Sequence, residues 1–231
     1  MGYGICLKVW GDYACFTRPE MKVERVSYDV ITPSAARGLI ESIYWKPAIR
    51  WEIDKIHVIN PIKFTNILRN EVKDKIPIRN VLQAIKGKDE PLFYESCDEK
   101  NRQQRASLIL KDVCYCIEAH FEMTEKAGEE DDEKKHYNIA LRRMKKGQFH
   151  HQPVFGTREF PAYFEYLEEP LKTNIQGPKV VDFGYMLYDM KFKEGPGKGI
   201  YYNLAEPVFY RAVMVDGVID VAKCLKESRV E

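Results

Sequence analysis

The order of predicted elements indicates an α+β protein built on an antiparallel sheet. Apolar and polar residues alternate, as in half-buried strands, at 4–10, 49–63, 108–123 and 160–167. Two other stretches, 34–46 and 135–147, carry apolar residues at helical spacing. The order strand, helix, strand, insertion, strand, helix, strand matches the ferredoxin-like (RRM-like, βαββαβ) arrangement, in which both helices cover one sheet face.

The first helix leads into a sharp corner. It is expected to begin at the cap-type residues Thr32–Ser34 and to end near Lys46, because Pro47 cannot continue a helix. Alternating residues 49–54 then return as a strand. Tyr44 and the Lys46 amine lie at this corner, where side chains are well placed to grip a ligand. Tyr44 would equally serve to cover the rim of the core.

A polar insertion separates this corner from the longest predicted strand. Residues 66–107 are polar and mixed; 80–86 read as a helical turn and 98–105 as a solvated loop. The strand 108–123 follows, with aromatic and aliphatic side chains on one face and two cysteines among the polar residues of the other. The insertion is too short and too polar to count as a domain.

The end of the chain is predicted to be all-β. From residue 180 it consists of short apolar runs, and Asp216-Gly217 between two of them is a strong signal for a two-residue hairpin turn. We therefore expect two domains. The first, 1–170, is the ferredoxin-like unit with its insertion at about 66–107, and the second, 171–231, is a small antiparallel β domain.

Composition indicates an ordinary soluble globular protein. The 231 residues are 45% hydrophobic and 31% charged, with a formal net charge of +1. The charges are nevertheless segregated along the sequence, since an acidic run at Glu129–Glu133 precedes a basic run at Arg142–Lys146. No apolar run approaches a membrane span, no leader is recognised, and the six cysteines form no CxxC pair. We expect a cytoplasmic protein without a membrane partner.

The start of the second helix carries a candidate for proton chemistry. Histidine exchanges protons near neutral pH, and Lys135 precedes His136 there, although the pair would equally form a solvated helix entrance. In a βαββαβ unit the end of the first helix and the start of the second can meet at one edge. Tyr44, Lys135 and His136 converging there would suit metal-free RNA cleavage by the ribose 2′-OH.

Candidate RNA contacts are basic or glycine-containing. Arg142 and Lys146 share a helix face that would contact phosphates or simply be solvated. The loop containing Gly156 and Arg158 would let phosphate approach the backbone, or it would be a plain turn. Lys46 is the remaining candidate.

No metal or other cofactor is expected. His150 and His151 are adjacent and cannot readily chelate one ion, and no carboxylate or cysteine stands at ligand spacing from them or from His120. The expected chemistry therefore depends on side chains and the RNA's own hydroxyl.

Several short strings resemble a known family. They are ESIYWKP (41–47), GDYACFT (11–17), LKDVCY (110–115), AHFE (119–122), KHYNI (135–139) and FGTRE (155–159). Together they resemble the type I-C CRISPR-associated "Cas five" family, D subtype, of the RAMP superfamily, in the same order from residue 5 to about 217. The resemblance implies a ferredoxin-fold domain followed by a small β domain. The family's catalytic Tyr, Lys and His match Tyr44, Lys135 and His136.

The resemblance also implies a function. Family members cleave precursor CRISPR RNA within each repeat without metal and stay bound in the Cascade surveillance complex. We therefore expect an endoribonuclease for the repeat hairpin that leaves a 2′,3′-cyclic phosphate and a 5′-OH. Its partners would be the repeat RNA and the other type I-C Cascade subunits, and duplex DNA stays an open candidate. The rival is a non-catalytic subunit that binds the 5′ handle of the CRISPR RNA.

The chain departs from the pattern in two places. The wider superfamily has a richer glycine loop than the lone Gly156, and the insertion 66–107 matches the family least.

Overall fold

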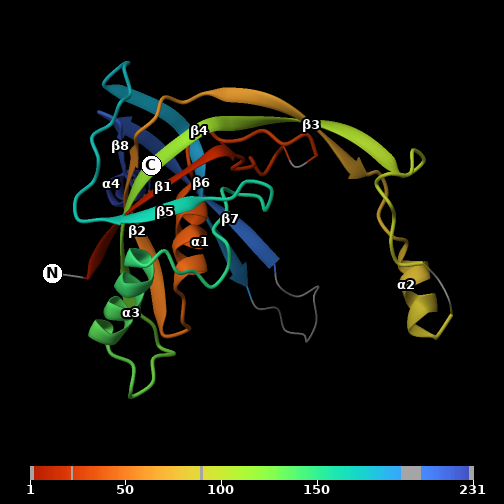
Figure 1. Ribbon diagram of the computed structural model, residues 1–231, viewed down its shortest axis with the longest axis horizontal. Helices are drawn as coiled ribbons and strands as arrows, with labels where there is room; N and C mark the ends of the chain where they lie inside the picture. The colour runs from red at the N-terminus through yellow and green to blue at the C-terminus, as the bar shows by residue number, and fades with distance from the viewer. Residues whose placement is uncertain (1–2, 22, 89–90, 194–203, 229–231) are drawn as a thin grey trace.

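The computed structural model describes residues 3–21, 23–88, 91–193 and 204–228 (Figure 1). Its elements are β1 (Gly4–Ala14), α1 (Pro33–Ile43), β2 (Ile49–Val58), β3 (Phe64–Val72), α2 (Ile78–Ile85), β4 (Arg102–Met123), α3 (Glu133–Lys145), β5 (Tyr163–Leu167), β6 (Val180–Lys193), β7 (Leu204–Val215), β8 (Val218–Asp220) and α4 (Val221–Ser228). None of the described helices is both long and apolar enough to cross a bilayer.

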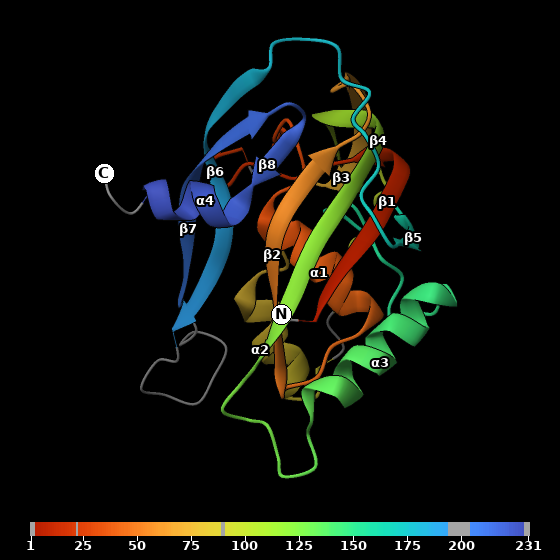
Figure 2. The ribbon, with the colours of Figure 1, turned by 90° about the vertical axis from the view of Figure 1, so that its left-hand side faces the viewer.

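One sheet runs through the whole molecule. Its strand order is β5-β1-β4-β2-β8-β7-β6, and β3 pairs with the outer part of β4. Every strand pairing in it is antiparallel. The prediction of a mixed fold with an antiparallel sheet is confirmed, and the C-terminal strands join that sheet where β8 pairs with β2 (Figure 2).

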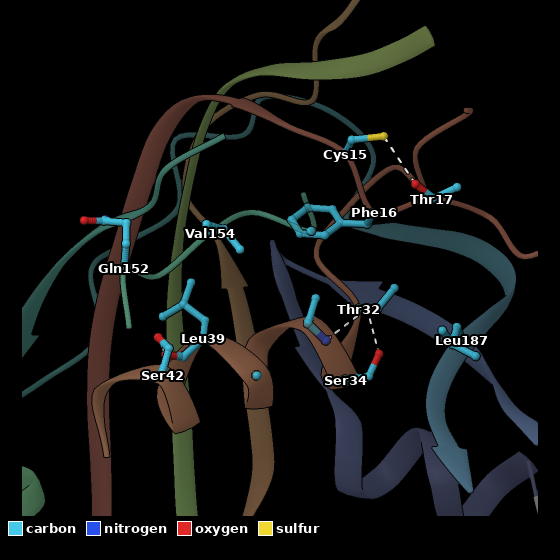
Figure 3. A pocket seen from close by; sticks show the side chains of 13 residues that line it. Cys15, Phe16, Thr17, Thr32, Ser34, Leu39, Ser42, Gln152, Val154 and Leu187 are labelled. Atoms are coloured by element: carbon cyan, nitrogen blue, oxygen red, sulfur yellow. Dashed lines mark hydrogen bonds between the residues drawn. The ribbon is translucent and has the colours of Figure 1, made fainter. Parts of the chain in front are cut away.

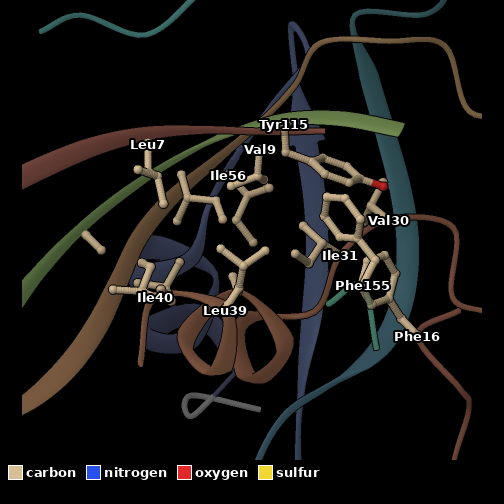
Figure 4. Packing of buried hydrophobic residues seen from close by; sticks show 14 of the residues in the cluster. Leu7, Val9, Phe16, Val30, Ile31, Leu39, Ile40, Ile56, Tyr115 and Phe155 are labelled. Carbon is tan, nitrogen blue, oxygen red and sulfur yellow. The ribbon is translucent and has the colours of Figure 1, made fainter. Parts of the chain in front are cut away.

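Helix α1 lies between two parts of this sheet, since it contacts both β2 and β6. Leu39 and Ile40 point from α1 towards buried strand residues such as Ile56 (Figure 4). On its other side, Arg37 donates two hydrogen bonds of 2.5 Å to the carboxylate of Asp189 on β6. The helix that carries the candidate corner is therefore held by apolar contacts and by a part-buried ion pair.

The predicted faces of the long strand are confirmed. Tyr115, Ile117 and Phe121 of β4 join the main core cluster. Cys114 and Cys116 point the other way and join a small buried cluster with Cys6. Both faces of β4 are thus covered near its middle, where the cysteines serve as small apolar residues.

The insertion forms an arm that projects from the sheet, with α2 at its far end (Figure 1). The predicted loop at 98–105 is only partly correct, because β4 already begins at Arg102. Backbone pairing explains the difference: residues of β3 up to Val72 stand opposite 102–110. Ladder hydrogen bonds hold a strand whose side chains are polar on both faces.

The C-terminal hairpin is confirmed, whereas the helix after it was not predicted. Asp216 and Gly217 have φ values of +48° and +79°, as the tight turn between β7 and β8 requires. The all-β reading is wrong beyond Asp220, whose side chain accepts a hydrogen bond of 2.9 Å from the Lys223 backbone N–H. That cap starts α4, which packs on β7 and β2.

Candidate active site

Tyr44 lies at the end of α1, where the chain turns into β2. Its backbone is extended (φ −150°), and its N–H donates to the Ile40 carbonyl at 3.0 Å. The Trp51 indole N–H donates to the Tyr44 carbonyl at 2.9 Å. With 2% of its surface exposed, the Tyr44 side chain is held firmly at this corner.

His136 meets Tyr44 from the first turn of α3. Its Nδ1 is 2.7 Å from the Tyr44 hydroxyl, and its Nε2 is 3.1 Å from a carboxylate oxygen of Asp131. Because a carboxylate only accepts, Nε2 carries the proton of the neutral ring and Nδ1 accepts from the Tyr44 O–H. Tyr44, His136 and Asp131 thus form one hydrogen-bonded chain, and His136 itself is only 2% exposed.

The loop before α3 holds the Asp131 carboxylate in position for its contact with His136. The Gly128 N–H donates to its second carboxylate oxygen at 3.0 Å. That bond, together with His136 and Lys135, holds the pKa of Asp131 below its usual range, so the group is ionised at neutral pH. The ionised Asp131 accepts from Nε2 and so holds the orientation of the imidazole ring, as a carboxylate does in acid–base catalysis generally.

Lys135 lies on the Asp131 side of the imidazole ring. Its ammonium donates to the Glu130 carbonyl at 3.1 Å and is 3.7 Å from Asp131. The structure therefore brings Tyr44 and His136 into direct contact, and it places Lys135 beside the carboxylate at the other end of the chain.

Arg143 is a site residue that the sequence reading missed. Its guanidinium carbon is 5.4 Å from the centre of the Tyr44 ring, and Nη1 donates to the Ile43 carbonyl at 2.9 Å. Burial raises the pKa of Tyr44, and the charge of Arg143 opposes that effect. The spacing carried a signal, since Arg143 follows His136 by seven residues and so lies on the same helix face. Arg142 and Lys146 are exposed to solvent.

An open cleft of about 610 Å³ borders Tyr44. Its lining includes Lys46, Arg143, His150 and His151, whereas His136 is not part of it. Tyr44 is therefore the member of the hydrogen-bonded chain that faces the cleft, and His136 lies behind it. Within the part of the chain that the structure describes, no three His, Cys, Asp or Glu side chains are grouped as metal ligands.

A second cleft, of about 450 Å³, continues along α1 towards the Gly156 loop (Figure 3). It shares Gly38 and Ser42 with the first cleft. Gly156 lines it with φ +84°, and a side chain there would overlap the Cys15 carbonyl oxygen. Arg158 is exposed on the same loop. The glycine thus serves close backbone packing at the wall of the cleft.

The fold is shared with CRISPR-associated proteins. A crystal structure described as "CRISPR-associated Protein" has a TM-score of 0.64 and 23% identity, covering 96% of this chain and 94% of that one. The functionally uncharacterized protein SMU1763c from Streptococcus mutans has a TM-score of 0.64 and 22% identity, with the same coverage. At these identities the likeness concerns the fold alone.

Sequence likeness is more specific. The family model for the CRISPR-associated protein Cas5d matches residues 4–222. The CRISPR pre-crRNA endoribonuclease Cas5d of Mannheimia succiniciproducens is 49% identical over 225 residues, 96% of each chain. The protein of the same name from Thermus thermophilus is 42% identical over 225 residues, covering 93% of this chain and 90% of that one. The chain belongs to the Cas5d family.

Proposed function

We propose that this protein is a metal-independent endoribonuclease that cleaves precursor CRISPR RNA within the repeat hairpin. One observation carries the proposal: Tyr44, 2.7 Å from the buried His136, lines a cleft that Lys46 and Arg143 also line. The two relatives at 49% and 42% identity are named as endoribonucleases for this RNA, which supports it.

The geometry suits attack by the ribose 2′-OH at the cut. Tyr44 passes its proton to Nδ1 of His136 while its oxygen takes the proton of the 2′-OH. Asp131 stabilises the imidazolium that forms. The 2′-oxygen bonds to phosphorus, the bond to the 5′-oxygen breaks, and the products are a 2′,3′-cyclic phosphate and a 5′-OH.

Transfer through this chain is concerted, because burial disfavours a free Tyr44 phenolate. Lys46 and Arg143 stabilise the charge of the phosphorane from the cleft. Lys135 is the third residue of the proposed catalytic set. Its ammonium lies beside Asp131, where it offsets part of the negative charge near the His136 ring.

Further RNA contacts come from the outer surface. We assign them to Arg142 on α3, to Lys146 directly after it and to Arg158 on the Gly156 loop, all exposed. The two clefts along α1, which share Gly38 and Ser42, give the RNA a continuous path between this loop and Tyr44.

We also propose the domain organisation and the setting. Residues 1–170 form a ferredoxin-like unit, supported by the strand order β5-β1-β4-β2 and the intervening helices α1 and α3. Residues 171–231 form the small C-terminal part. Its strand β8 pairs with β2, and its helix α4 packs on β2. The protein acts in the cytoplasm and stays on its product as a subunit of the type I-C Cascade complex.

Incubation of the purified protein with repeat RNA in excess EDTA tests this function. Cleavage should proceed, and it should stop when the 2′-OH at the cut is replaced by hydrogen, because the nucleophile is then missing. A requirement for Mg²⁺ would contradict the mechanism. Tight binding of the RNA without any cleavage would favour the rival role of a structural subunit at the 5′ handle.

A further inference from the structure

Cleavage by a 2′-OH requires two proton transfers, one from the nucleophile and one to the leaving 5′-oxygen. Of the members of the chain Tyr44–His136–Asp131, Tyr44 alone lines the cleft, and both nitrogens of the buried His136 ring are already engaged. Lys135 lies at the far end of that chain. A second proton-transfer group must therefore come from elsewhere in the cleft.

Two further histidines line the same cleft. His150 and His151 follow the end of α3, and their backbone N–H groups both donate to the Ser42 carbonyl, at 2.9 and 3.1 Å. Their ring centres are 4.3 Å apart, and both residues are exposed. Because Ser42 is two residues before Tyr44, this anchor holds the histidine pair close to the corner that carries the tyrosine.

The other cations of the cleft are poorly suited to give up a proton. A guanidinium stays protonated in proteins, which excludes Arg143. An ammonium group is a much weaker acid than an imidazolium, so histidine is the better donor at neutral pH. Lys46 and Arg143 instead supply fixed positive charge.

We propose that the His150–His151 pair is the general acid of this site. The inference rests on the function proposed above. In the step, the 2′-OH proton passes to the Tyr44 oxygen while Tyr44 gives its own proton to Nδ1 of His136. The 2′-oxygen–phosphorus bond forms, and the phosphorus–5′-oxygen bond breaks. An imidazolium of the pair gives its proton to the departing 5′-oxygen, and a neutral imidazole remains.

The test compares two RNA substrates. One is the natural repeat hairpin, and the other carries sulfur in place of the bridging 5′-oxygen at the cut. A thiolate leaves without protonation, so the second substrate does not need a general acid. The variant His150→Ala/His151→Ala should cut the natural RNA slower by about 10²-fold or more. It should cut the sulfur-bridged RNA at a rate near that of the unchanged protein.

Two variants serve as controls. Tyr44→Phe should be slow on both substrates, because it removes the group that acts on the 2′-OH. His120→Ala removes another histidine, paired with Asp54 outside this cleft, and should leave both rates unchanged. Affinity for the hairpin with a 2′-deoxy cut site should stay within a few-fold in all variants, which shows that each is folded.

The outcomes separate the two proposals. A double variant that cuts natural RNA at the full rate, or that stays slow on the sulfur-bridged RNA, would overturn the role of the histidine pair alone. An unchanged protein that cuts neither RNA would overturn the proposed function, and this role with it.

Discussion

At the scale of single residues, the site depends on how His136 is oriented. A neutral imidazole can place its proton on either nitrogen, and only one choice leaves Nδ1 free to accept from Tyr44. Asp131 makes that choice by accepting from Nε2 at 3.1 Å. It can do so because the Gly128 N–H occupies its other oxygen and keeps the carboxylate in place.

Replacing Asp131 by Asn should therefore slow cleavage by about 10²-fold or more. Gly128 and His136 donate to different oxygens of Asp131, and an amide keeps only one of these two acceptors. If the asparagine NH₂ faces Nε2, the proton of the neutral imidazole moves to Nδ1. A protonated Nδ1 cannot accept a hydrogen bond from Tyr44. Single-turnover cleavage of repeat RNA measures the change. Asp131→Glu, which keeps both oxygens, should recover part of the rate.

Asp132→Asn is the matched control, since it makes the same charge change one residue later. Asp132 is the N-cap residue of α3, but its side chain makes no capping hydrogen bond. The Asp132→Asn variant should cleave repeat RNA at a rate close to that of the unchanged protein. Equal losses in Asp131→Asn and Asp132→Asn would mean that charge near the helix start matters, rather than the orientation of His136.

Gly156 gives a second prediction at this scale, on stability. Gly156→Ala should destabilise the protein more than Gly147→Ala does. Both have positive φ, which costs an alanine about 1–2 kcal/mol, but only at Gly156 would the new Cβ also overlap the Cys15 carbonyl. Urea unfolding gives the two free energies of unfolding. Similar losses would show that the Gly156 loop moves aside easily.

At the scale of elements, helix α4 begins at a side-chain cap. The apolar run after Asp216-Gly217 looks like continued strand in the sequence, yet the chain turns into a helix at Val221. The Asp220 side chain accepts from the Lys223 N–H, and Val221 and Cys224 are buried. A short apolar run is compatible with strand or helix, so here the cap decides.

Asp220→Ala should lower the free energy of unfolding by about 1 kcal/mol, the usual value of such a cap. The expected cause is the loss of the hydrogen bond that the Asp220 side chain accepts from the start of α4. Chemical unfolding followed by circular dichroism measures it. Lys223→Ala keeps the backbone N–H and should change stability little. A loss as large in Lys223→Ala would assign the effect to the side-chain pair that Lys223 makes with Glu227 instead.

The helices and strands also show which features the sequence could predict and which it could not. The turn around Pro47, the two faces of β4 and the Asp216-Gly217 hairpin follow from neighbours in the chain, and all three are confirmed. Helix α1 nevertheless ends at Ile43, earlier than the end near Lys46 that Pro47 predicts. The strand at Arg102–Arg105 could not be predicted from its polar side chains. It exists because β3 supplies backbone partners opposite it.

At the scale of the whole molecule, a net charge of +1 must be reconciled with binding RNA. Lys46 and Arg143 lie together on the Tyr44 cleft, and Arg158 is exposed beside the cleft that adjoins it. Part of the negative charge lies outside both clefts, for example at the exposed Glu95, Asp98 and Glu99 of the arm. A segregated positive face can bind phosphates although the total is near zero.

Salt dependence of RNA binding tests this distribution. Lys46→Gln and Arg158→Gln should each reduce the slope of log affinity against log salt by about 0.7–0.9, the value of one phosphate contact. Lys223→Gln on α4 should leave the slope unchanged. Filter binding at several salt concentrations with 2′-deoxy hairpin gives the slopes. Unchanged slopes at Lys46 and Arg158 would place the RNA on another face.

The sequence by itself determined which residue types stand at the corner and at the start of α3. Helical spacing, the break at Pro47 and the alternation of strands are local properties, so Tyr44 and His136 could be predicted as a pair. Only the tertiary structure decided that Asp131 completes this pair and that Arg143 turns inward to Tyr44. Arg143 bonds to Ile43, 100 residues away in the sequence, and Asp131 bonds to His136 across the loop that enters α3. The geometry of both contacts depends on how α1 and α3 pack on one sheet.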